Sequence, residues 1–160
     1  MVDATTKDGP MLSQKAKYAL RALLALAEEG DDKPLLIADI AERHSLPKKF
    51  LEQILLDLKH HGLVQSRRGR SGGYSLLKPA SQISFGQVVR IIDGPLAPLP
   101  CLSKMAYRRC ADCPGEESCA IRRVFALTHQ VTTTVLDRTT LADALREAPL
   151  EAGLTRREVA

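Results

Sequence analysis

The sequence predicts a mainly α-helical protein with a small β-hairpin, arranged as a winged helix-turn-helix followed by one long C-terminal helix. Three observations indicate this fold class. Two segments with helical apolar spacing, 37–43 and 47–60, are joined by a turn of about four residues. A glycine-rich turn between two short apolar segments follows at once, at 63–77. A longer amphipathic segment then begins after Cys119.

The first helix is expected within 12–29, with Ser13 available as its N-cap. Gly30 and the two aspartates after it end the helix, and the polar residues 1–10 before it are expected to form a disordered leader. The apolar residues that repeat at helical spacing are Ala16, Ala19, Leu20, Leu23, Leu24, Leu26 and Ala27.

The helix-turn-helix is expected after the break at Pro34. Residues 44–46 turn the chain, and Pro47 suits the first turn of the next helix because its missing N–H would be unpaired there. That helix is expected to end before Gly62. The side chains that it is expected to bury are Phe50, Leu51, Ile54, Leu55 and Leu58. Two helices joined by a turn also occur in many helical bundles, so this motif alone indicates little.

The wing is the hairpin expected from strands at 63–66 and 74–77. Its tip carries Arg67, Arg68 and Arg70 among glycines, which allow backbone angles that other residues resist. An ordinary flexible hairpin with a basic tip is the alternative. A further helix is expected at 84–92, capped by Ser84 and ended by the sequence Asp-Gly-Pro.

The composition bounds the class of protein. The 160 residues are 44% hydrophobic and 26% charged, which is typical of one soluble domain or of a small domain with an appendage. No apolar run approaches the roughly 20 residues of a membrane span. The first ten residues also lack the apolar stretch of a secretion signal, so we expect a cytoplasmic protein.

The charge is unevenly distributed. The chain carries +4 overall, but the segment 43–78 carries +6, with eight basic and two acidic residues, which leaves −2 for the remainder. A basic block on a nearly neutral chain indicates a polyanionic partner, and a solvated charged face is the alternative.

All four cysteines of the chain, Cys101, Cys110, Cys113 and Cys119, fall within nineteen residues. The segment 95–119 around them is rich in proline and has no sustained apolar period, so its order must come from something other than a hydrophobic core. Four thiolates could hold a [4Fe–4S] or [2Fe–2S] cluster, or a zinc ion. The spacing of Cys110 and Cys113 also suits a thiol–disulfide switch, and the three possibilities stay open at this point.

The long helix after Cys119 presents an apolar face that needs a partner, either the first helix or a second copy of the chain. A brief helix near 141–145 and a flexible charged tail, 146–160, complete the chain. The expected organisation is therefore a leader at 1–10, a winged helix-turn-helix at 11–94, a cysteine-rich loop at 95–119, the long and short helices at 120–145, and the tail.

The ordered series of motifs across residues 11–145 resembles the bacterial Rrf-two (Rrf2) family, which includes IscR, NsrR, RirA and CymR. The residues that carry the resemblance are Leu12-Ser13, Lys17 to Arg21, Ile37 to Ala41, Phe50 to Leu55, Leu58, Gly62 to Val64, Arg68-Gly69, and Gly72 to Tyr74. The resemblance implies a dimeric winged helix-turn-helix transcription factor. In many members an iron–sulfur cluster is held in the loop before the dimerisation helix.

The resemblance also suggests ligands. Cys101, Cys113 and Cys119 match the family's three cysteines, whereas Cys110 lies within extra residues of a longer first gap. The positions that supply the fourth ligand in family members hold Arg122 and Lys17 here, and neither cation is a useful iron ligand. Cys110 is therefore the candidate fourth ligand. Zinc and a disulfide are the alternatives.

By the same resemblance, the protein is expected to bind double-stranded DNA at a palindromic operator as a homodimer, with repression as the expected mode. The signal would be iron, redox state or nitric oxide. Lys48, Lys49, Glu52 and Gln53 would enter the major groove, and plain solvent exposure is the alternative for Glu52 and Gln53. The wing would contact DNA through Arg67, Arg68, Arg70, Ser71, Gly72, Gly73 and Tyr74.

A redox or electron-transfer protein that does not bind DNA is the alternative from another class. It would explain the cysteines but would leave the basic block without a role. The sequence shows no nucleophile–base pair and no phosphate-binding glycine loop, so we expect no enzyme.

Overall fold

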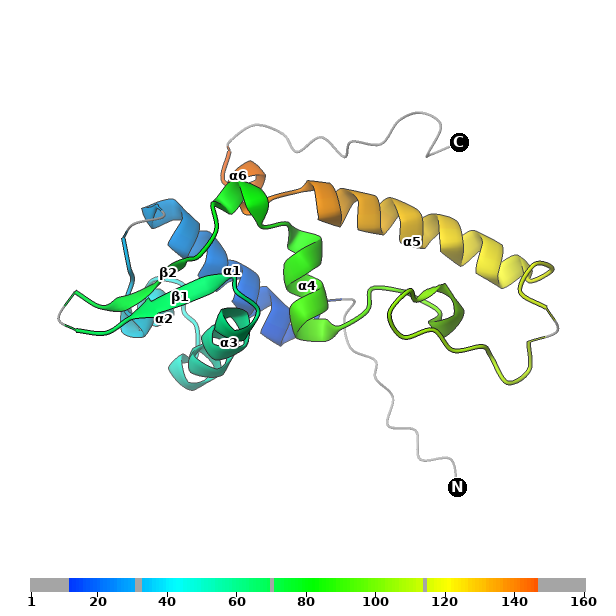
Figure 1. Ribbon diagram of the computed structural model, residues 1–160, viewed down its shortest axis with the longest axis horizontal. Coiled ribbons are helices and arrows are strands. Elements are labelled where there is room, and N and C mark those ends of the chain that lie inside the picture. Colours follow the sequence, from blue (N-terminus) through cyan, green and yellow to red (C-terminus); the bar gives the residue numbers. More distant parts are fainter. Residues whose placement is uncertain (1–11, 31–32, 70, 114, 147–160) are drawn as a thin grey trace, which may run out of the picture.

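The computed structural model describes residues 12–30, 33–69, 71–113 and 115–146 (Figure 1). The expected leader, Arg70 and all of the expected tail except Arg146 lie outside these ranges. The elements are α1 (Gln14–Glu29), α2 (Ile37–Arg43), α3 (Lys48–His60), β1 (Val64–Arg67), β2 (Gly73–Leu76), η1 (Ala80–Gln82), α4 (Phe85–Asp93), η2 (Pro100–Leu102), α5 (Ala120–Arg138) and α6 (Leu141–Ala144). The predicted fold class, mainly helical with a hairpin wing, is confirmed.

Helix α1 is the centre of the core. It packs against α3, α4, α6 and β2, and its buried side chains alternate at helical spacing between small alanines and leucines such as Leu23 and Leu26. Ser13 caps the helix as expected, because its hydroxyl oxygen accepts a hydrogen bond from the Ala16 N–H at 3.0 Å. The same hydroxyl donates to the Asp93 carboxylate, which ties the start of α1 to the end of α4.

Helix α3 buries Leu51, Ile54, Leu55 and Leu58, which lie on one stripe, so four of the five expected side chains are confirmed. Phe50 is a correction, since 57% of it is exposed. It precedes Leu51 by one position and is therefore rotated about 100° away from the stripe. Its ring meets the Tyr18 ring edge-on at 6.5 Å. Pro47 is the N-cap rather than a first-turn residue.

The wing is a two-stranded antiparallel ladder in which Val64 pairs with Leu76 and Arg67 with Gly73, so each strand is displaced by one residue from the expected bounds. Two backbone hydrogen bonds of 2.8 Å between Leu35 and Tyr74 add a third segment to its edge. Gly73 makes this approach possible, because a Cβ there would lie 2.4 Å from the Leu35 carbonyl oxygen. The glycine therefore shapes the base of the wing from within the protein.

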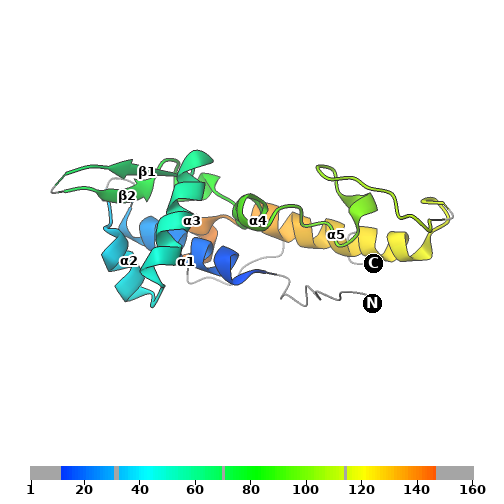
Figure 2. The same cartoon turned by 90° about the horizontal axis from the view of Figure 1, so that it is seen from below.

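We call the part of the chain from α1 to α4, which includes the hairpin, the winged region. Helix α5 extends away from it (Figures 1 and 2). Its C-terminal end is anchored there. Phe85 donates its N–H to the Thr139 carbonyl at 3.0 Å, and Leu141 donates its own to the Ile83 carbonyl at 2.9 Å. The cysteine loop, residues 95–119, runs from the end of α4 to the N-terminal end of α5, which lies far from the winged region (Figure 1). None of the helices in the described ranges is long and apolar enough to cross a lipid bilayer.

Candidate nucleic-acid interface and cysteine loop

The outer face of α3 presents the four side chains that the sequence singled out on this helix. Lys48, Lys49, Glu52 and Gln53 are all exposed, on the side away from the buried stripe. The Gln53 amide donates a hydrogen bond to Asp57 at 3.0 Å, which orients its side chain along the helix. The N-terminal half of α3 therefore offers two cations, one carboxylate and one amide to a partner.

Asp57 fixes α3 against α1. Its carboxylate forms an ion pair with the Lys15 ammonium, with 2.7 Å between Nζ and Oδ2. The hydrogen bond from Lys15 is the main cause that holds the pKa of Asp57 below its ordinary value, and the bond from Gln53 adds to it. Lys59 in turn donates to the Ser66 hydroxyl at 2.7 Å, which connects the end of α3 to β1.

The wing tip exposes Arg67, Arg68 and Ser71, whereas Arg70 lies outside the described ranges. Gly72 is buried, and its N–H donates to the Gly69 carbonyl at 2.9 Å to close the turn. A Cβ at Gly72 would lie 2.5 Å from the Arg67 carbonyl oxygen, so the turn requires glycine. The tip is thus basic at its surface and constrained by backbone contacts beneath.

Sequence reasoning missed Leu56. It lies on the outer face of α3, three residues after Gln53 and seven after Lys49, and 41% of it is exposed. Counting helical spacing from the two polar residues would have found it.

The cysteines differ in their surroundings. Cys101 is buried in the single turn η2, Cys110 is exposed, and Cys113 and Cys119 are half-buried; all four are free thiols. The pKa of the Cys110 thiol is raised, first by partial loss of water and then by the neighbouring thiols of Cys101 and Cys113. The Cys113 N–H donates to the Cys110 carbonyl at 3.3 Å.

Cys119 occupies a separate position as the N-cap of α5, where its sulfur accepts the Arg122 N–H at 3.4 Å. Within the described ranges, no group of three His, Cys, Asp or Glu side chains converges in a metal-binding arrangement. The donor set suits a soft metal or an iron–sulfur cluster by its chemistry. Binding all four sulfurs to one group would require the loop to draw Cys119 and the other three together.

Polar contacts connect the cysteine loop to α5. Arg122, at a position where the family resemblance placed a ligand, forms an ion pair with Glu116 at 3.6 Å. The Tyr107 hydroxyl donates to the same carboxylate, and this hydrogen bond is the main cause that raises the pKa of Tyr107. Arg109 donates to the Cys113 carbonyl at 3.2 Å. A rearrangement of the loop would therefore act directly on the first turn of α5.

Comparisons with known proteins agree on one family. A family model described as Rrf2, iron-dependent transcriptional regulator, matches residues 12–147. A helix-turn-helix regulator from Rhodobacter capsulatus, described as rrf2-like, is 54% identical over 138 residues, which cover 84% of this chain and 92% of that protein.

Two solved structures show the same likeness. CymR of B. subtilis, described as the global cysteine regulator, superposes with a TM-score of 0.70 at 30% identity and covers 83% of this chain and 94% of its own. IscR of T. potens superposes with a TM-score of 0.66 at 29% identity, over 92% of this chain and 94% of its own.

Proposed function

Because this chain belongs to the Rrf2 family of transcriptional regulators, we propose that it is a homodimeric repressor whose cysteine loop holds an iron–sulfur cluster. The cluster would sense iron, redox state or nitric oxide. The observation that carries this proposal is the position of the thiols. All four free thiols lie in the cysteine loop that leads into α5, and one of them, Cys119, caps that helix.

DNA binding would use α3 and the wing. Lys48 and Lys49 contact phosphates or guanine, Gln53 reads adenine, and Glu52 accepts from cytosine. Arg67, Arg68 and Arg70 reach the adjacent minor groove or its phosphates. Ser71 lies at the exposed tip beside them. Gly72, Gly73 and Tyr74 act indirectly, since their backbone contacts fix the shape of the tip.

Dimerisation would cover the outer face of α5. No residue of this helix is buried in the single chain, and the exposed fractions of its large apolar side chains run from 41% to 65%. These side chains are Ile121, Val124, Phe125 and Leu127. A two-fold pair presents two reading heads, which matches a palindromic operator.

The cluster would be held by Cys101, Cys110, Cys113 and Cys119. When bound, it supplies a redox-active and reagent-sensitive inorganic centre. Cys119 caps α5 and the Arg122–Glu116 ion pair spans the loop and the helix, so the order of the loop sets the position of the first turn of α5. Zinc bound by the same four thiolates is an alternative. The spacing of Cys110 and Cys113, whose backbones are joined by a hydrogen bond of 3.3 Å, favours a second candidate, a thiol–disulfide regulator of the same fold.

Purification of the untagged protein without air tests the proposal, with a visible spectrum and with iron, sulfide and zinc analysis. We expect iron and sulfide in the wild type and their loss in Cys113→Ala. Loss in Cys110→Ala as well would assign the fourth ligand, and unchanged iron there would remove Cys110 from the ligand set. Zinc without iron would support the zinc alternative. Colourless, metal-free protein that forms a Cys110–Cys113 disulfide on oxidation would support the second candidate.

A further inference from the structure

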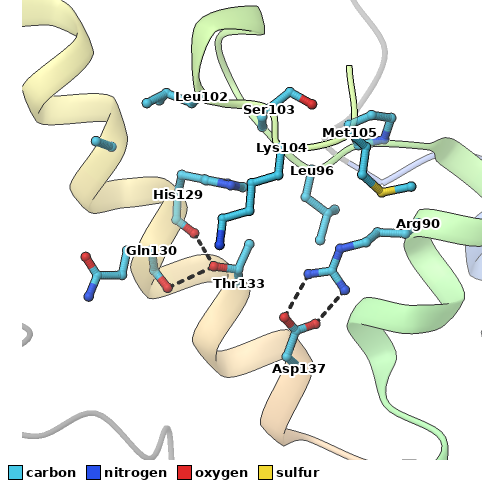
Figure 3. Close-up of a pocket in the computed structure, with 13 residues that line it drawn as sticks. Arg90, Leu96, Leu102, Ser103, Lys104, Met105, His129, Gln130, Thr133 and Asp137 are labelled. Carbon is cyan, nitrogen blue, oxygen red and sulfur yellow. Dashed lines mark hydrogen bonds and ion pairs between the residues drawn. The ribbon is translucent and has the colours of Figure 1, made fainter. Parts of the chain in front are cut away.

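A cavity of about 420 Å³ lies between α4, the first half of the cysteine loop and the inner side of α5 (Figure 3). This volume falls within the roughly 300–1,000 Å³ that is common for small-molecule sites. The lining residues that matter most are Arg90 on α4, Leu96, Leu102 and Lys104 on the loop, and His129 and Asp137 on α5.

The charges around this cavity do not cancel. Arg90 and Asp137 form a two-bonded ion pair, with distances of 2.7 and 2.8 Å, that closes one side of the cavity. Lys104 extends from the loop toward α5 (Figure 3), and no ion pair in the described ranges involves it. The lining therefore carries one cation whose charge is unmatched.

His129 adds an unmatched polar atom to the same lining. Its Nδ1 is shielded from solvent and has no hydrogen-bond partner among the described residues. Buried polar atoms without partners are uncommon in folded proteins, and an absent ligand or water is one of the usual reasons for them. The backbone carbonyl of His129 is already engaged, because it accepts the Thr133 hydroxyl at 2.7 Å. The ring nitrogen is thus the unpaired polar atom of this lining.

The remaining lining is largely apolar. Leu96, Leu102 and Met105 come from the loop and Ala126 from α5. Such a surface suits a hydrocarbon or aromatic body, whereas Lys104 and His129 suit an anionic head. A fully polar ligand such as inorganic phosphate would leave these apolar side chains without a partner.

The cavity is separate from the apolar face expected to pair in a dimer. Its α5 residues Ala126, Gln130, Thr133 and Asp137 follow one another at intervals of three or four. Val124, two residues before Ala126, points to the opposite side of the helix. A dimer formed through the outer face of α5 therefore leaves this cavity on the inner side.

We propose that this cavity binds a small organic monocarboxylate, with the carboxylate on Lys104 and His129 and the apolar body against Leu96 and Leu102. Residues 102–105 directly follow Cys101 and form one side of the site, so the ligand would order this part of the loop. The site uses none of the four thiols. It stands or falls separately from the iron–sulfur proposal.

Calorimetric titration of the full-length protein with benzoate tests this site, with benzamide as the neutral probe of the same shape. We expect benzoate to bind and benzamide to bind much more weakly. Lys104→Gln should weaken benzoate binding by about tenfold or more, the size typical for loss of a hydrogen bond to a charged group. The matched control is Lys33→Gln, an exposed lysine on the α1–α2 connection, which should bind like the wild type.

Amide chemical shifts would locate the bound probe. Benzoate should perturb residues 102–105 and 126–133, and unchanged melting temperatures would show that both variants fold. The proposal is overturned by no binding at millimolar benzoate, by equal binding of benzamide, by equal effects of the two lysine substitutions, or by shifts confined to another surface.

Discussion

The winged region and the α5 region, by which we mean α5 with the cysteine loop, obtain their order in different ways. Every α-helix of the winged region buries apolar side chains in one shared core, and several of these, such as Leu55 and Ile40, are fully enclosed. Helix α5 has 19 residues and buries none of them, and in the described part of the cysteine loop only Cys101 and Ser103 are buried. The first region is complete in one chain. The second leaves its apolar side chains exposed in the single chain.

DNA affinity should give the largest effect, and the contacts to DNA would come from the winged region. If a dimer contacts six to ten phosphates, its affinity should fall about 10³–10⁵-fold between 50 and 200 mM salt. Changing Arg67 and Arg68 together to Ala should flatten this dependence, because each phosphate contact that is lost lowers the slope by about one. Fluorescence anisotropy with promoter DNA measures it. Lys33→Ala is the control, and a wild-type affinity insensitive to salt would contradict the docking.

Core truncation should show how far the winged region is self-sufficient. Leu55→Ala removes a fully buried side chain of α3 and should lower the free energy of unfolding by about 2–5 kcal/mol. Leu56→Ala, on the exposed face of the same helix, should change it by about 0.5 kcal/mol or less. Urea unfolding followed by circular dichroism gives both values. Equal losses in the two variants would contradict the core assigned to α3.

The same difference explains what could be predicted from the sequence. Helices α1, α3 and α4 were predictable because apolar spacing and the caps Ser13 and Ser84 report burial within one chain. The exposure of Phe50 was missed because a ring next to a buried stripe looks like part of it. The requirement for Gly73 was also missed, since the Leu35 segment that approaches it is distant in sequence.

The candidate site could likewise be predicted only where it lies on the winged region. The exposure of Lys48, Lys49 and Gln53 followed from the phase of α3, whereas the arrangement of the thiols could not be derived from spacing. The sulfur of Cys119 caps α5, and loop contacts such as Arg122 with Glu116 hold the start of that helix. Those contacts carry no periodic signal in the sequence.

Disruption of the outer face of α5 should weaken the dimer without changing the stability of the winged region. Val124→Asp places a charge on this exposed apolar face and should weaken the dimer by about 2 kcal/mol or more, the size of an interface hot spot. Unfolding of the winged region should change little, because Val124 contributes nothing to its core. Sedimentation velocity measures the dimer, with the neighbouring Arg123→Ala as control. A variant as dimeric as the wild type would mean that another surface pairs.

The smallest effect is expected from the ion pair between Lys15 and Asp57, which lies wholly within the winged region. Both side chains are partly exposed, so solvent screening limits the pair to about 1 kcal/mol or less. The folded pKa of Asp57 is lowered, so its stabilising contribution is present above the ordinary carboxyl pKa of about 3.9 and is lost as the pH falls through the lowered folded value.

Asp57→Asn should therefore cost stability at pH 7, and its difference from the wild type should disappear under strongly acidic conditions. Urea unfolding across this range measures the effect, and Glu28→Gln, which removes an exposed carboxylate of α1, is the control. A difference that is the same at every pH would assign the loss to the shape of the side chain rather than to its charge. The buried core alone would then hold α1 against α3. The stability of the winged region would not need this surface ion pair, which would sharpen its contrast with the exposed α5 region.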